Sequence, residues 1–106
     1  MKLLTVVAKV IAKNEFTDEV GMNLRKLLFP TRSEDGCVNY DLHRSIENPA
    51  IYIFHENWKS KSHLDAHLQS LHLTSCMDNI KHMIEGLEVY QLEVIEQLID
   101  TSSPAK

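Results

Sequence analysis

Two strand-like segments stand near the middle of the chain, CVNYDLHR at residues 37–44 and AIYIFHENW at residues 50–58. In the first, Val38, Tyr40 and Leu42 alternate with polar residues, which is typical of a β-strand with one apolar face. The second is rich in β-branched and aromatic residues. Only residues 45–49 separate them, and so short a connection suits a hairpin rather than a parallel crossover. The two segments therefore predict an antiparallel pair.

The segment before this pair predicts a strand and then a helix. Residues 3–12 are rich in β-branched residues and contain no Gly or Pro, and they carry apolar side chains on both faces. From residue 16 onward, apolar residues recur at spacings of three and four, which indicates an amphipathic helix. We expect Pro30 to end or kink that helix, because its ring removes an amide donor and clashes with the preceding turn. Residues 31–35 would then form a bent extra turn.

The segment after the pair predicts a second helical region and a fourth strand. Ser60 or Ser62 is expected to cap the first helical stretch. Apolar positions continue through a second stretch that we expect Gly86 to close. Residues 87–96 alternate in the manner of a strand, and residues 97–106 have the composition of a tail. The helical region carries these apolar positions: Leu64, Leu68, Leu71, Met77, Ile80 and Ile84.

The predicted order is β-α-β-β-α-β, which is typical of an α+β, ferredoxin-like protomer with two helices on one face of an antiparallel sheet. We therefore expect one domain over residues 1–96, followed by the tail at 97–106. Because the first and fourth strands are apolar on both faces, the face without helices needs a cover. A second copy of the same sheet is the least costly one, so we predict a homodimer.

Composition excludes several classes of protein. The 106 residues carry a net charge of −4, which has the wrong sign for binding nucleic acid. No apolar run approaches the ~20 residues of a membrane span. Lys9 and Lys13 interrupt the only candidate signal peptide, so a cytoplasmic location is expected. Cys37 and Cys76 fit neither a disulfide framework nor a zinc knuckle, and we interpret them as reduced thiols.

Residues 54–72 hold four of the six histidines and the single Trp, so a metal site is the first hypothesis to weigh. His63 and His67 lie one helical turn apart. However, His63 falls well away from the predicted apolar stripe, no Glu lies between the two in the metalloprotease arrangement, and no third ligand is evident. We therefore expect no metal.

Three residues of this stretch are candidates for chemistry. His67, at the border of the apolar stripe, would present one ring nitrogen to a cavity; the alternative is a structural histidine bonded to the backbone. Glu56 shares one face of its strand with Tyr52, Phe54 and Trp58, so it is a candidate acid or base, or else a salt-bridge or capping residue. Trp58 is either core or the wall of a site for a flat ligand.

These residues resemble those of the antibiotic biosynthesis monooxygenase family, particularly its quinol monooxygenase-like bacterial members. The resemblance rests on SEDGCVNY at 33–40, ENWKS at 56–60, HLDAHLQS at 63–70 and His72, and it spans the chain to about Glu96. It implies a dimeric α+β barrel of ferredoxin-like protomers, each with a pocket between sheet and helices. It also implies oxygenation of an electron-rich aromatic substrate without flavin, haem or metal, so we expect no cofactor.

The resemblance suggests how the pocket would work. A deprotonated hydroquinone or polycyclic phenol can itself reduce dioxygen, so the protein supplies a base, an anion site and a dry cavity. The expected roles are His67 as base or anion-stabilising donor, Glu56 as its orienting partner, Trp58 and Phe54 as walls, and Tyr40 and His72 as further pocket residues. A small aromatic or quinone-like molecule is thus the expected ligand.

Similar barrels also include other activities. Haem-degrading members typically use an Asn on the first strand, where this chain has Val6, Val7 and Ala8, so haem cleavage is not expected. The alternative that remains open is a dimeric protein that binds or isomerises a small metabolite without oxygen chemistry.

Overall fold

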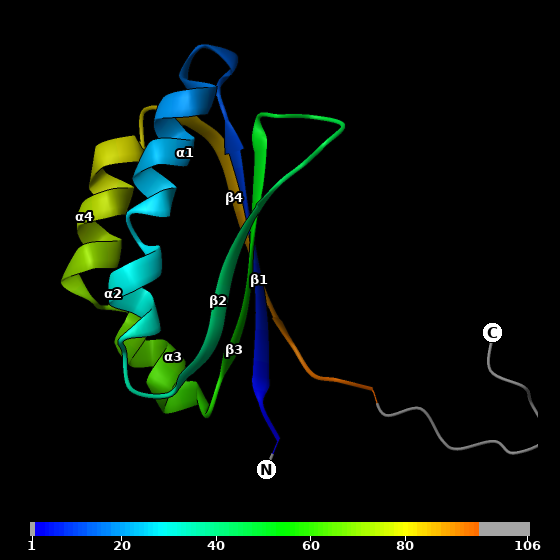
Figure 1. The fold of residues 1–106 in the computed structure, drawn as a ribbon, viewed down its shortest axis with the longest axis vertical. Helices are drawn as coiled ribbons and strands as arrows, with labels where there is room; N and C mark the ends of the chain where they lie inside the picture. The colour runs from blue at the N-terminus through cyan, green and yellow to red at the C-terminus, as the bar shows by residue number, and fades with distance from the viewer. Residues whose placement is uncertain (1, 96–106) are drawn as a thin grey trace, which may run out of the picture.

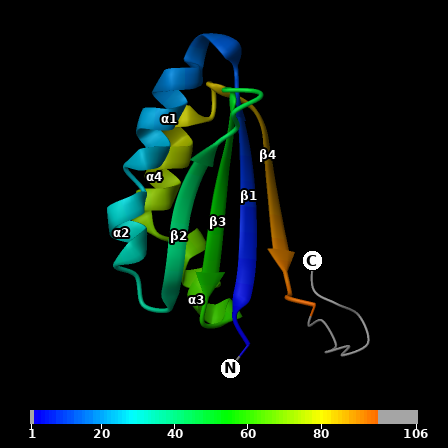
Figure 2. The same ribbon diagram turned by 45° about the vertical axis from the view of Figure 1, so that its right-hand side comes forward.

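The computed structural model describes residues 2–95, and its sheet has the predicted topology. Four antiparallel strands stand in the order β2-β3-β1-β4. Their bounds are Leu4–Ala12 for β1, Cys37–Arg44 for β2, Ile51–Trp58 for β3 and Ile84–Leu92 for β4. Figures 1 and 2 show the helices stacked against one side of this sheet only. The α+β, ferredoxin-like prediction is therefore confirmed.

The predicted antiparallel pairing of residues 37–44 with residues 50–58 is confirmed. Tyr40 pairs with Glu56 and Leu42 with Phe54, and all four side chains face the helices. A register shift between Cys37 and Asn39 marks the start of β2. The hairpin thus presents its aromatic face, together with a carboxyl group, to the interior.

The first helical region is interrupted earlier than expected. A short 3₁₀ turn over Asn14–Phe16 leads into α1 (Thr17–Arg25), and α2 (Leu28–Arg32) follows. Pro30 lies inside α2 rather than after a helix. Its ring would clash with the carbonyl four residues earlier, at Lys26, if the first helix continued. The break therefore falls between the two helices, and the extra turn expected at residues 31–35 begins at residue 28.

The second helical region also divides in two. Ser60 caps α3 (Lys61–Leu68), where its hydroxyl accepts the backbone N–H of His63, and Ser70 caps α4 (Leu71–Ile80) in the same way. Leu71, placed on the apolar stripe in the sequence analysis, is wrongly assigned and is 80% exposed. Because Ser70 starts a new helix, residues 64 and 71 do not share one helical face.

The fourth strand begins before its predicted start. The chain turns through residues 81–83, and Ile84 and Gly86, both assigned to the helical region, lie in β4. Gly86 pairs with Ile11, next to a register shift at the end of β1. Glu85 and Gly86 interrupt the alternation that marked the rest of the strand, which is why the sequence misplaced its start. The predicted tail at residues 97–106 lies outside the described residues.

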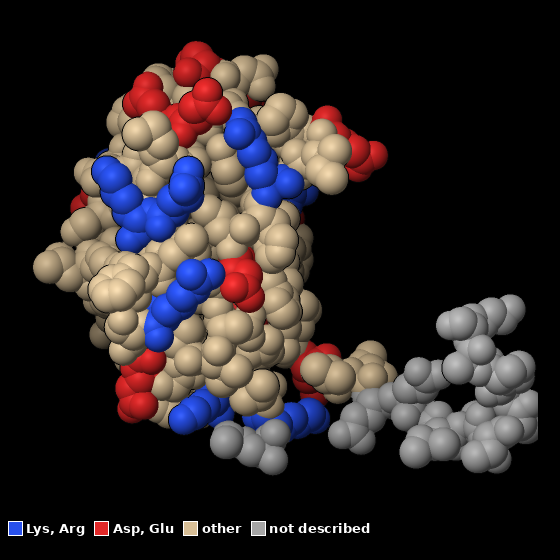
Figure 3. All heavy atoms as spheres, in the orientation of Figure 1, with Lys and Arg blue, Asp and Glu red and all other residues tan. Residues whose placement is uncertain are grey.

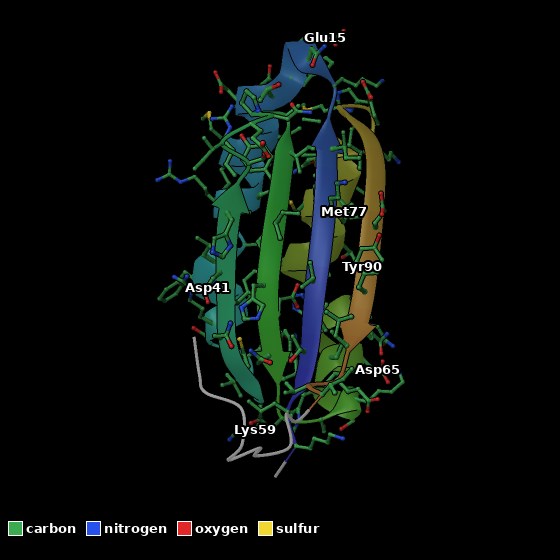
Figure 4. All side chains as sticks on the ribbon, turned by 90° about the vertical axis from the view of Figure 1, so that its right-hand side faces the viewer. Glu15, Asp41, Lys59, Asp65, Met77 and Tyr90 are labelled. Carbon is green, nitrogen blue, oxygen red and sulfur yellow. The ribbon has the colours of Figure 1, made fainter. Side chains whose placement is uncertain are left out.

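The sheet has one face covered by helices and one uncovered. The covered face packs Val6, Val10, Tyr52, Phe54 and Trp58 against the helices. The other, which we call the open face, is turned to the viewer in Figure 4, where Asp41 on β2 and Tyr90 on β4 stand on either side of the central strands.

The described surface carries charges of both signs. On the side of the molecule in Figure 3, Lys and Arg lie in separate groups interrupted by Asp and Glu. Within residues 2–95, none of the helices has the length and apolar character that crossing a membrane would require.

Candidate active site

A cavity lies between the sheet and the helices. Its volume is about 370 Å³, within the usual range for small-molecule sites. All four strands and helices α1, α3 and α4 contribute to its lining, which is mainly aliphatic and aromatic. In Figure 4, Met77 of α4, a lining residue, lies behind the sheet. Leu68 of α3 and Leu87 and Val89 of β4 also line the cavity but are about half exposed, so the cavity opens to solvent beside these three residues.

Glu56 brings a carboxyl group into this apolar space. It is 4% exposed and lines the cavity, and its Oε1 accepts a hydrogen bond of 2.9 Å from the indole Nε1 of Trp58. Burial raises the pKa of Glu56 to about 7, and the charge of Glu34 adds to this, while the Trp58 bond opposes it. Near neutral pH this side chain can therefore hold a proton or release one.

His67 is the second polar group in the cavity lining. It projects from α3, is 2% exposed, and its ring lies 4.7 Å from the ring of Trp58 and 5.4 Å from that of Tyr40, centre to centre. Its Nδ1 is 2.7 Å from Oε2 of Glu34. Because a carboxylate oxygen only accepts hydrogen bonds, Nδ1 carries the proton in this arrangement.

The orientation of His67 leaves its other ring nitrogen available. Nε2 has no hydrogen-bond partner in residues 2–95, and in the neutral ring with its proton on Nδ1 it is an acceptor at the cavity wall. Burial lowers the pKa of His67, and the hydrogen bond and charge of Glu34 oppose this effect. The neutral ring is thus favoured by burial and fixed in one tautomer by Glu34, which are the properties of a general base.

Glu34 joins a second histidine to this arrangement. The same Oε2 lies 2.7 Å from Nε2 of His72, near the start of α4. Glu34 and His72 are partly exposed and do not line the cavity. One carboxylate oxygen therefore bridges a buried histidine and a more exposed one.

The residues singled out in the sequence analysis come together, at different distances from the cavity. His67, Glu56, Phe54 and Tyr40 line it, and the Tyr40 and Phe54 rings stack 4.7 Å apart. Trp58 is fully buried and lies behind the lining, where it contacts both polar groups.

Sequence reasoning missed Glu34 as a site residue and expected Glu56 to orient His67, whereas Glu34 contacts His67 and Glu56 is bonded to Trp58. Glu34 lies in the turn between α2 and β2, 33 positions before His67, and no periodicity links the two. Its only signal was membership of the SEDGCVNY segment on which the resemblance rests. Glu34 and His72 also supply, beside His67, the additional ligand-type groups that the sequence did not reveal. His63 instead contacts Ser60 and Asp35.

Comparison with known proteins shows similarity in sequence and in fold. Residues 3–79 match the family model described as antibiotic biosynthesis monooxygenase. The protein Rv0793 of Mycobacterium tuberculosis is 32% identical over 69 residues, which are 65% of this chain and 67% of that protein.

Solved structures match over most of the chain. One of an antibiotic biosynthesis monooxygenase superposes with a TM-score of 0.83 at 29% identity, covering 88% of this chain and 99% of that one. PA3566 of Pseudomonas aeruginosa, at 24% identity, shares the fold with a TM-score of 0.86, covering 91% of this chain and 97% of its own. The chain belongs to the antibiotic biosynthesis monooxygenase family.

Proposed function

We propose that this protein is a cofactor-independent monooxygenase that oxidises a hydroquinone or polycyclic phenol with dioxygen. The observation that carries the proposal is the paired placement of His67 and Glu56 in one apolar cavity. The first has a free, unprotonated nitrogen and the second a carboxyl group whose pKa of about 7 allows it to give a proton. Family membership adds support, since the family is named for monooxygenases.

Deprotonation of the substrate is the step that requires the protein. Nε2 of His67 accepts the phenolic proton, and the imidazolium that forms is stabilised by Glu34 at Nδ1. The resulting phenolate is electron-rich enough to pass one electron to dioxygen. The mainly apolar lining keeps water from the radical pair.

The proposed reaction balances without an external reductant. For a hydroquinone, the semiquinone radical and superoxide combine through a new carbon–oxygen bond to give a hydroperoxide. Cleavage of its O–O bond leaves one oxygen atom on the ring as a hydroxyquinone and releases the other as water. The substrate supplies all four electrons that dioxygen accepts, and Glu56 is positioned to donate a proton to the departing oxygen.

The remaining predicted residues have supporting roles in this proposal. Tyr40 and Phe54, stacked on each other, form an aromatic wall for the substrate ring. Trp58 holds the carboxyl group of Glu56 and packs on the ring of His67. His72 shares the carboxylate that orients His67.

The test is oxygen uptake by protein stripped of metals and flavin, with a panel of hydroquinones and polycyclic phenols. We expect saturable uptake of one dioxygen per substrate oxidised, with one labelled oxygen atom entering the product from ¹⁸O₂. Release of hydrogen peroxide with no label in the product would contradict the monooxygenase assignment. Absence of any uptake would favour a protein that binds or isomerises a small metabolite.

A further inference from the structure

Three side chains with metal-ligand chemistry converge beside the cavity, and the proposed oxygenation does not need them as ligands. Glu34, His67 and His72 each offer one donor atom, and the three atoms lie within 4.8 Å of one another. Oε2 of Glu34 is 2.7 Å from both ring nitrogens.

The fold, not a sequence motif, brings these atoms together. The two histidines are five positions apart, a spacing that would point them in different directions on one continuous helix. Here α3 ends at Leu68 and Ser70 caps the start of α4. The two rings therefore lie on either side of a helix break, 6.2 Å apart between centres. The turn after α2 then places Glu34 between them.

Two imidazole nitrogens and one carboxylate oxygen are a donor set that binds divalent first-row transition metals. In a tetrahedral site with bonds of about 2.0–2.1 Å, the donor atoms stand about 3.3 Å apart. The two distances from the Glu34 oxygen to the histidine nitrogens therefore have to lengthen by about half an ångström, while the two nitrogens, which lie within 4.8 Å of each other, settle at about the same spacing. Glu34 and His72 are partly exposed, which gives them room to move and gives a fourth ligand, such as water, access from solvent.

We propose that Glu34, His67 and His72 form a binding site for a divalent transition metal ion with one position left open. Its ligand nitrogen on His67 is Nδ1, which now donates to Glu34. A metal at Nδ1 displaces that proton, so the neutral ring must carry its proton on Nε2. The cavity-facing Nε2 then becomes a hydrogen-bond donor, so His67 with a bound metal ion can no longer accept a proton from the substrate.

The binding test does not depend on the proposed oxygenase activity. Metal-free protein is titrated with Co²⁺ and Zn²⁺, following the visible absorption of bound Co²⁺ and competition for Zn²⁺ with a chromogenic chelator. We expect one ion per chain and no comparable binding of Mg²⁺, which prefers oxygen ligands.

Matched variants locate the ion. His72→Ala, at a partly exposed position, and Glu34→Gln, which keeps the side-chain shape, are each expected to weaken Zn²⁺ binding by about 100-fold or more, since loss of a ligand exceeds the 10–100-fold cost of losing an outer partner. His63→Ala is the control, because His63 lies on the same helix as His67 but belongs to the Ser60 and Asp35 contacts. It should leave binding unchanged. Thermal unfolding checks that each variant is folded.

Several outcomes would overturn the proposal. They are absence of Zn²⁺ and Co²⁺ binding, binding that survives His72→Ala and Glu34→Gln in folded protein, and equal weakening by His63→Ala. Oxygen consumption without metal binding would contradict the metal site but not the proposed function. Metal binding at these residues without oxygen consumption would contradict the proposed function but not the metal site.

Discussion

The two faces of the sheet differ in burial: alternate residues of the same strand are buried on one face and exposed on the other. On β3, Tyr52, Phe54, Glu56 and Trp58 are buried under the helices, whereas His55 on the opposite side is exposed. The covered side holds the cavity, together with Glu56, His67 and Tyr40, whose pKa values burial shifts. Removal from water, more than residue type, therefore distinguishes the Glu56 carboxyl group and the His67 imidazole from their exposed counterparts.

The open face is itself divided. Toward β2, a chain of hydrogen bonds runs from Thr5 to Asn57, from Asn57 to Asn39, and from Asn39 to Asp41, over 2.6, 2.8 and 3.0 Å. Toward β4, the same face is mainly apolar and carries Val7, Ile11, Tyr90 and Leu92 around one facing pair of charged residues, Lys9 and Glu88. We expect the second copy in the predicted homodimer to cover mainly this apolar half.

The largest expected difference between the faces is in the free energy of unfolding, and it is tested with one substitution on each face of β3. Trp58→Ala removes a fully buried side chain and the donor to Glu56, and should lower the free energy of unfolding by about 3–5 kcal/mol. His55→Ala, on the open face, should change it by about 0.5 kcal/mol or less. Urea unfolding at one protein concentration measures both. Equal losses from the two would contradict the contrast between the faces.

A second prediction uses the pH dependence of stability. The pKa of Glu56 is raised by folding from 4.5 to about 7, so the native state holds its proton more tightly. That stabilisation is complete below pH 4.5 and is lost as the pH rises through about 7. Glu56→Gln stays neutral and keeps an oxygen to accept from Trp58.

The variant and the unmodified protein should therefore be about equally stable near pH 4.5, and the variant should be more stable by up to about 3 kcal/mol at pH 8.5. Glu47→Gln, in the exposed loop between β2 and β3, is the control and should show no such divergence. If Glu56→Gln is no more stable than the unmodified protein at high pH, the Glu56 carboxyl group is not desolvated.

The third prediction concerns the open face. Tyr90→Asp places a charge in its apolar half and should raise the dimer dissociation constant by about 100-fold, which corresponds to ~2.7 kcal/mol. Met22→Asp, at an exposed position on α1, is the control. Light scattering across a concentration series measures both. An unmodified protein that is monomeric at micromolar concentration would remove the prediction.

The sequence predicted the elements that depend on local pattern. The alternation at residues 37–44 and the aromatic face of β3 predicted the antiparallel hairpin and the position of Glu56 among aromatic side chains. Local pattern misplaced the bounds of elements. The break expected at Pro30 falls before residue 28, Leu71 belongs to the helix that Ser70 caps rather than to the apolar stripe of the one before it, and Gly86 concealed the start of β4.

Prediction of the site likewise succeeded for residues on periodic elements and failed for a residue in a turn. His67 and Glu56 were found because each lies at a definite position on a periodic element. Glu34 was missed because it reaches His67 only after α2, β2 and α3 have packed, and its turn has no periodicity to project. For the same reason Trp58 was taken as a cavity wall, whereas the structure places it behind the lining.

The most direct test of the central claim, that the covered face holds the base of an oxygenase, is oxygen uptake by metal-free His67→Ala beside metal-free His55→Ala, with the hydroquinone that the unmodified protein turns over fastest. In protein that remains folded, His67→Ala should lose about 100-fold in turnover, which is the scale expected for loss of a positioned acid–base group. His55→Ala, on the open face, should retain turnover close to that of the unmodified protein. Full turnover by folded His67→Ala would contradict the account.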